Sequence, residues 1–87
     1  MNAKTDYAVA PGAYLAEWAQ AHDIDEHALA DRLGRDLIST RRVLRGLCPV
    51  DEQLAITLAG LTSIPSRAWL GYQRVYDADL ARLDRQE

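Results

Sequence analysis

This sequence is short of the residues that build covalent and catalytic sites. Its 87 residues include one cysteine and two histidines. The single cysteine, Cys48, cannot form a disulfide within the chain, and we expect it to be a small, partly buried residue in a reduced, cytoplasmic setting. His22 and His27 have neither a nucleophile nor a third ligand beside them in the sequence. The sequence therefore predicts no metal site, no cofactor and no enzymatic activity.

Long apolar runs, export signals and phosphate-binding loops are lacking as well. There is no run of 18 apolar residues, and the N-terminus has no positively charged region followed by an apolar stretch. Neither membrane association nor secretion is therefore expected. No glycine-rich phosphate loop occurs, and no segment alternates apolar and polar residues as a half-buried strand would.

The periodicity that is present is helical throughout. With 48% hydrophobic residues in 87, the chain suffices for one compact all-α domain of about five helices. Residues that start or stop helices are Pro11, Asp25, Asp36, Asp51 and Pro65 or Ser66 at the starts, and His22 with Asp23, Gly34 and Gly46 at the stops. Residues expected to face the core are Leu15, Trp18, Ala19, Leu29, Ala30, Leu33, Val43, Leu44, Leu54, Ala55, Leu58 and Ala59.

Residues 25–46 have the pattern of a helix-turn-helix. A turn of three residues, beginning at Gly34, separates two short helices, and the small residue Ala30 lies four positions before that glycine. A larger side chain at Ala30 would push the two helices apart. In such a motif the second helix is the one that enters the major groove of DNA.

Charge is concentrated in the same region. Residues 32–45 contain five arginines and one aspartate, a net charge of +4, whereas the whole chain carries −3. A local cluster of guanidinium groups can release counterions from a duplex although the protein as a whole is acidic. On charge alone, these arginines could equally be the solvated face of a helix.

The order and spacing of several motifs resemble HigA-type antitoxins of the XRE helix-turn-helix family. The resemblance starts at Pro11-Gly12, passes through residues 25–46 and Pro49-Val50-Asp51, and ends in W-L-x-x-Q-x-x-Y-D at residues 69–77. It implies a five-helix, lambda-repressor-like homodimer that binds an operator palindrome in double-stranded DNA. In an antitoxin, it also implies neutralisation of a small RelE-like ribonuclease toxin.

The resemblance also implies a DNA-binding surface. Its residues are Arg35, Leu37, Ile38, Ser39, Arg41, Arg42 and Arg45. Arg42 is the candidate base reader, because a guanidinium can bond bidentately to guanine. Arg41 and Arg45 are expected at phosphates, and Ser39 could donate to a phosphate. Leu37 and Ile38 could contact thymine methyl groups, or they could be exposed or dimer-facing hydrophobic residues.

Three positions depart from the family pattern. Glu26 stands where a glutamine commonly reaches a phosphate, so its carboxylate should be repelled by DNA. Thr40 replaces a branched aliphatic residue and should bond its hydroxyl to a carbonyl one turn back. Ser63 replaces a glycine, which predicts a rearranged entry into the last helix.

The last helix, expected at residues 65–84, carries an aromatic and aliphatic stripe. Trp69 is expected in the core. Tyr72, Tyr76, Leu80 and Leu83 extend the stripe further than so small a domain can cover, which favours a dimer interface. Residues 1–10 are expected to form an N-terminal arm.

Two other functions stay open at this point. The chain could be a small phage-type repressor without a toxin partner, which the sequence does not separate from an antitoxin. It could also be a protein-interaction module that keeps the fold but has lost operator binding, as Glu26 and the acidic remainder of the chain would suggest.

Overall fold

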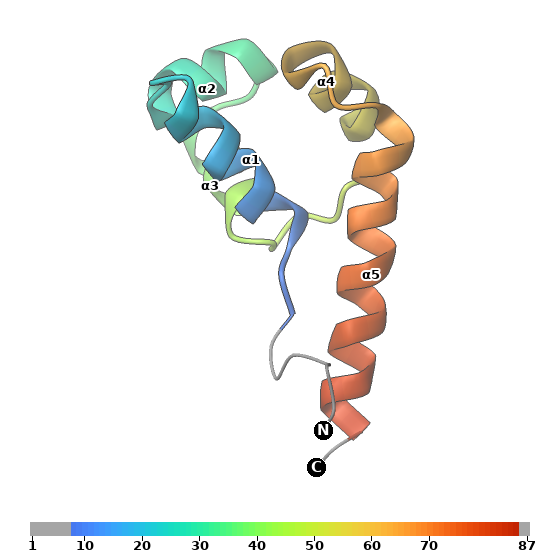
Figure 1. Cartoon of the computed structure of the whole chain (residues 1–87). Helices are drawn as coiled ribbons and strands as arrows, with labels where there is room; N and C mark the ends of the chain where they lie inside the picture. The colour runs from blue at the N-terminus through green and yellow to red at the C-terminus, as the bar shows by residue number, and fades with distance from the viewer. Residues whose placement is uncertain (1–7, 86–87) are drawn as a thin grey trace.

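The computed structural model describes residues 8–85 and contains five α-helices (Figure 1). They are α1 (Pro11–Ala21), α2 (Glu26–Leu33), α3 (Leu37–Leu44), α4 (Glu52–Thr62) and α5 (Ser66–Arg85). The all-α prediction is confirmed for these residues. Residues 1–7 of the expected N-terminal arm lie outside the described part of the chain.

Three aspartates begin the three middle helices. Asp25, Asp36 and Asp51 each accept a hydrogen bond from the backbone N–H three residues later, at 2.8, 2.6 and 2.8 Å respectively. Each carboxylate thereby satisfies one of the backbone donors that a helix leaves unpaired in its first turn. The three predicted N-caps are confirmed, and Pro11 occupies the first turn of α1 as expected.

Left-handed backbone conformations end or follow several helices. Gly34 has φ of 68° and Gly46 has φ of 76°, which glycine adopts without steric cost. Ser63 also has a positive φ, of 67°, at the C-terminus of α4. Position 63, where the resemblance predicts glycine, therefore has the left-handed conformation with serine in place, and α5 begins at Ser66, one of the two predicted starts.

The helices pack as two groups that share one core. Helix α3 packs against α1 and α2, while α4 packs against α5, and contacts of α1 with α5 and of α2 with α4 join the groups. Helix α5 runs down one side of the molecule and extends well past the other four (Figure 1). The helix-turn-helix of α2 and α3 therefore lies on the opposite side from α5.

Trp69 and the aliphatic stripes of the first four helices form the core. Trp69 is fully buried, as predicted. The other buried apolar residues are Leu15, Ala19, Leu29, Ala30, Leu33, Val43, Val50, Leu54, Ala55 and Leu58. Trp18 and Leu44 pack against this core but stay partly exposed, and Ala59 is also partly exposed.

The two buried threonines satisfy their hydroxyls locally. Thr40 donates to the carbonyl oxygen of Asp36 at 2.9 Å, which confirms the predicted bond one turn back. Thr62 donates to the carbonyl oxygen of Leu58 at 2.7 Å. Its hydroxyl oxygen also accepts from the Ile64 N–H at 3.1 Å and from the Trp69 indole N–H at 3.3 Å. Thr62 thus ties the end of α4 to the central tryptophan.

Replacing Thr62 with valine should reduce the free energy of unfolding by about 1–3 kcal/mol. Valine fills the same space but leaves the buried Trp69 indole N–H without an acceptor, and that desolvation is not compensated. Urea unfolding followed by tryptophan fluorescence measures the loss. Thr57→Val is the matched control, because Thr57 makes a similar bond to its own helix, to the Gln53 carbonyl oxygen, in an exposed setting. Equal losses in both variants would contradict the role of the indole bond.

The motif at residues 69–77 joins α5 to the segments before it. The side-chain oxygen of Gln73 accepts from the Val50 N–H at 2.8 Å, and its amide nitrogen donates to Asp77 at 2.9 Å. Asp77 thereby orients the amide that holds the segment before α4. A β-carbon at Gly46 would lie 3.3 Å from the hydroxyl oxygen of Tyr76, so this ring packs against the end of the helix-turn-helix. The motif therefore has an intramolecular structural role.

Helix α1 approaches the backbone of α3 very closely at Gly12. A β-carbon at this position would lie 2.1 Å from the carbonyl oxygen of Val43 and 2.5 Å from that of Leu44. Only a residue without a side chain allows this packing.

In the described part of the chain, no helix combines the length and the apolar composition that crossing a membrane requires.

Candidate nucleic-acid interface

The turn between α2 and α3 is built from backbone hydrogen bonds and buried side chains. After the left-handed Gly34, the N–H of Arg35 bonds to the carbonyl oxygen of Ala30 at 3.0 Å. Leu33 and Val43 are buried in the core cluster. Ala30 is 5% exposed, which agrees with its expected place between the crossing helices. The orientation of α3 relative to α2 is therefore determined by tight packing.

One face of α3 is exposed and the opposite face is buried. Ile38 is 65% exposed, and Arg42 and Arg45 are exposed as well. These residues follow one another at steps of four and three, so they lie along a single stripe of the helix and its C-terminal end. Thr40 and Val43 face the core. We call Ile38, Arg42 and Arg45 the exposed stripe of α3.

Arg35 lies just before α3 and bonds to a side chain in the first turn of that helix. Arg35 donates from Nη1 to the hydroxyl oxygen of Ser39 at 3.0 Å. Ser39 accepts in this bond, so its own hydroxyl proton stays available for another acceptor. Leu37, next to them, is partly buried. Arg35 and Ser39 thus form one polar unit beside the exposed stripe.

Arg41 and Glu26 form an ion pair that joins α3 to α2. The Nε of Arg41 lies 2.9 Å from Oε1 of Glu26, and the two side chains are 43% and 47% exposed. The carboxylate that was expected to repel DNA is therefore neutralised by a neighbouring arginine. Arg41, expected at a phosphate, has a partner within the protein. Ion pairs this exposed contribute about 0–1 kcal/mol, so a phosphate group can compete for the arginine.

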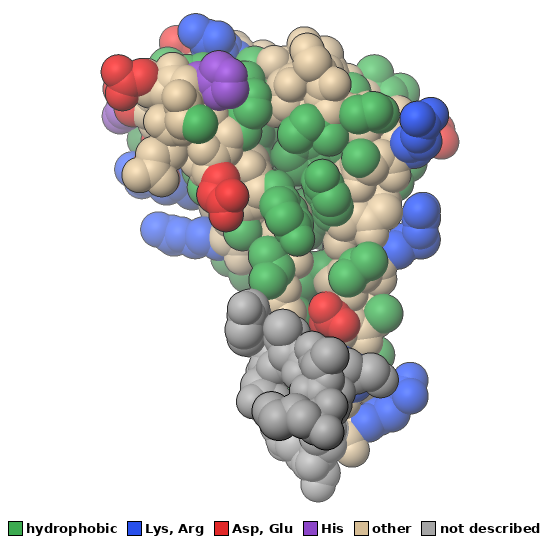
Figure 2. All heavy atoms as spheres, viewed as in Figure 1, with side chains coloured by type: hydrophobic (Ala, Val, Ile, Leu, Met, Phe, Trp, Pro, Cys, Tyr) green, Lys and Arg blue, Asp and Glu red, His purple; other side chains and the backbone are tan. Residues whose placement is uncertain are grey.

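Basic side chains project from the side of the molecule where α3 lies, and others project along α5 (Figure 2). In this view, basic side chains of residues 8–85 therefore lie both on the surface at α3 and on the surface along α5. The surface at α3 differs from the other because its arginines are mounted on two short helices of fixed geometry. Across residues 8–85, no three His, Cys, Asp or Glu side chains gather as a metal-binding group.

The four residues expected at a dimer interface lie in two different environments. Tyr72 stacks on Tyr14 of α1 with ring centroids 4.4 Å apart, and it meets Trp69 edge-on at 5.4 Å. Tyr76 packs against Gly46. Leu80, in the part of α5 beyond the other helices, is 44% exposed. Leu83 is partly buried. The two tyrosines therefore have contacts within the chain, and the dimer interface stays a prediction.

The ion pair between Glu26 and Arg41 was not expected from the sequence. The two residues are 15 positions apart and lie on different helices. The sequence shows that the two residues have opposite charges, but no residue near either of them indicates that the two helices bring them together. The crossing of α2 and α3 was the available signal, because it places the first turn of α2 near the middle of α3.

Comparison with known proteins shows the fold. No protein-family model matches the sequence, and no curated protein matches it. Among solved structures, antitoxin GraA has a TM-score of 0.83 at 23% identity, covering 92% of this chain and 87% of that one. Pseudomonas aeruginosa antitoxin HigA, solved with the higBA promoter, has a TM-score of 0.77 at 24% identity, covering 85% and 82%. An addiction module antidote protein of a HigA family from Coxiella burnetii has a TM-score of 0.76 at 24% identity, covering 86% and 83%.

These likenesses extend over most of each chain. They show that the five helices are arranged as in these antitoxins, and they confirm the predicted fold class. At 23–24% identity, these likenesses show the fold and not the roles of individual side chains.

Proposed function

We propose that this protein is a sequence-specific DNA-binding regulator, a HigA-like antitoxin or repressor that binds an operator palindrome as a homodimer in the cytoplasm. The observation that carries the proposal is the exposed stripe of α3, with Arg42 and Arg45 solvent-exposed on the second helix of a helix-turn-helix. The HigA protein of Pseudomonas aeruginosa, solved with the higBA promoter, shares the fold, and this likeness supports the proposal that the present chain binds DNA.

The side chains of this surface divide into base and phosphate contacts. Arg42 is exposed at the centre of the stripe and can present two parallel N–H donors to O6 and N7 of a guanine. Arg45, at the C-terminal end of α3, suits a phosphate. Ser39 can donate its hydroxyl proton to a phosphate while Arg35 holds its oxygen. Ile38, with Leu37 beside it, offers an apolar contact to a thymine methyl group.

Dimerisation is the second part of the proposal. The distal half of α5 extends past the other helices and carries Leu80, which is 44% exposed (Figure 1). Leu83 follows on the same face of the helix. A second copy of the chain packed along this segment would cover the apolar residues and bring two recognition helices to the two halves of a palindrome. The antitoxin form of the proposal adds a small RelE-like ribonuclease toxin as a partner.

A salt titration tests DNA binding directly. The probe is the duplex immediately upstream of the protein's own coding sequence, compared with a shuffled duplex of the same composition. If Arg41 and Arg45 of both protomers reach phosphates, the logarithm of the DNA association constant should fall with the logarithm of the salt concentration, with a slope of about −3 to −4. The upstream duplex should bind more tightly than the shuffled duplex. Absence of binding at low salt, or equal affinity for the two duplexes, would refute the proposal.

A further inference from the structure

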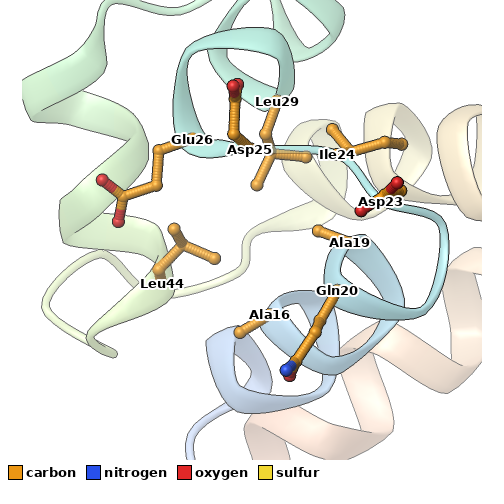
Figure 3. A pocket seen from close by; sticks show the side chains of 9 residues that line it. All are labelled: Ala16, Ala19, Gln20, Asp23, Ile24, Asp25, Glu26, Leu29 and Leu44. Atoms are coloured by element: carbon orange, nitrogen blue, oxygen red, sulfur yellow. The ribbon is translucent and has the colours of Figure 1, made fainter.

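A second surface lies beside the helix-turn-helix, away from the exposed stripe of α3. A cavity of about 570 Å³, open to solvent, lies between α1, the loop that follows it, α2 and the end of α3. Its apolar lining comes from Ala16, Ala19, Ile24, Leu29 and Leu44. Figure 3 shows these side chains around the space that separates α1 from α2 and α3. We call this cavity the α1–α3 groove.

The rim of the groove is acidic. Asp23, Asp25 and Glu26 line it, and none of its lining residues is an arginine, lysine or histidine. Asp25 uses one oxygen to cap α2 and is otherwise exposed, and Asp23 is exposed with no ion partner among residues 8–85. Glu26 is already paired with Arg41 and Asp25 caps α2 with one oxygen, so the free negative charge at the rim is that of Asp23 and of the second oxygen of Asp25. This charge repels the phosphates of DNA and attracts a cation.

We propose that the α1–α3 groove is the docking site for a segment of a partner protein that presents an arginine or lysine flanked by apolar side chains. The long methylene stem of such a residue suits the alanine and leucine floor, and its charged head reaches the carboxylate rim. The flanking apolar side chains cover Ile24 and Leu44. Charge complementarity and the apolar floor together select a basic partner.

Glu26 links this groove to the DNA-binding surface. The same carboxylate that lines the groove holds Arg41 of α3 at 2.9 Å. A partner cation that engages Glu26 releases Arg41, which can then reach a phosphate. Docking of the partner therefore strengthens DNA binding, and DNA binding strengthens docking by the same factor. This coupling rests on the proposed function, whereas the docking itself does not.

Docking is tested without DNA by nuclear magnetic resonance on the 15N-labelled chain. The probe is the peptide Ac-AALRALRAA-NH2, and the control peptide is Ac-AALEALEAA-NH2. We expect the arginine peptide to shift the amide signals of the groove residues, and Asp23→Asn combined with Glu26→Gln to weaken its binding about three- to ten-fold. Asparagine suits position 23 because it tolerates the positive φ of 60° there.

Two further variants locate the binding site. Ala16 is exposed in the groove, and Ala21 is exposed on the same helix outside it. Ala16→Trp should abolish peptide binding, and Ala21→Trp should leave it unchanged. The proposal would be overturned if the arginine and glutamate peptides bound equally well, or if the arginine peptide shifted only signals of α5. It would also be overturned if the Ala16→Trp variant bound the arginine peptide as tightly as the wild-type chain. Self-association that Ala16→Trp abolishes would assign the groove to a second copy of the chain and would also overturn it.

The coupling is tested by repeating the DNA titration with the arginine peptide at saturation. DNA affinity of the wild-type chain should rise about two- to five-fold, which corresponds to the release of one exposed ion pair. Glu26→Gln should start at the raised affinity and show no further response. Peptide binding without any change in DNA affinity would refute the coupling. If no DNA binds at all, the proposed function fails while the resonance experiment still decides the groove.

Discussion

Replacing Gly12 with alanine should lower the free energy of unfolding by about 3 kcal/mol or more, a large part of the total stability of a domain this small. The added β-carbon would lie 2.1 Å from the carbonyl oxygen of Val43, and both atoms belong to rigid helices. No side-chain rotation can relieve that overlap. Helix α1 would have to move away from α3, opening the core around Leu15 and Val43.

Thermal and urea unfolding followed by circular dichroism measure this loss. Gly60→Ala is the matched control, because Gly60 lies inside α4 and a β-carbon there meets no atom within 4 Å. The control should gain about 0.5–1 kcal/mol, since alanine is the better helix former. A Gly12→Ala variant about as stable as wild type would show that α1 can be repositioned without cost and would contradict the close packing.

Combining Arg42→Ala with Arg45→Ala should cause the largest loss of DNA affinity among paired surface substitutions. Loss of the Arg42 base contact should cost about 1–3 kcal/mol at each half-site and relax the preference at one base pair. Loss of Arg45 should weaken binding to all sequences and reduce the salt slope by about 0.9 for each protomer. Both residues are exposed, so the fold should be unaffected.

Fluorescence anisotropy with the upstream and shuffled duplexes separates these effects. The single Arg42→Ala variant should lose mainly the difference between the two duplexes, and Arg45→Ala mainly the salt dependence. Arg67→Ala is the control, because it removes the same charge from an exposed position on α5. If the double variant binds as tightly as wild type, or if Arg67→Ala weakens binding equally, α3 is not the recognition helix.

The Glu26–Arg41 pair reduces the positive charge that the helix-turn-helix presents in the free protein. Counting five arginines against Asp36 gives a strongly basic segment, but Arg41 is engaged by Glu26 in the free protein. Arg42 and Arg45, the two arginines of the exposed stripe, have no ion partner among residues 8–85 and therefore carry the free positive charge of this helix and its C-terminal end. The pair spans two helices of the motif, so any ligand of Glu26 also acts on α3.

Local signals were sufficient to predict the helices and their ends. Asp25, Asp36 and Asp51 act as caps through the N–H groups three residues later, so the interaction is contained within a few positions of sequence. The left-handed turn at Gly34 is equally local. The burial of Trp69 was expected from the resemblance that includes residues 69–77, and it is confirmed. Alignment of Arg42 with Ile38 followed from helical periodicity alone.

Contacts between distant positions were decided only by the tertiary structure. The requirement for glycine at position 12 depends on how closely α1 approaches α3, and no residue near Gly12 reports that distance. Tyr72, expected at a dimer interface, stacks on Tyr14 because α5 passes alongside α1. The Glu26–Arg41 pair and the α1–α3 groove arise in the same way. The sequence by itself determined the helices, their caps and the cationic helix, because those interactions act over three or four residues. The packing of helices determined which of those charges and aromatic rings remain free to meet a partner.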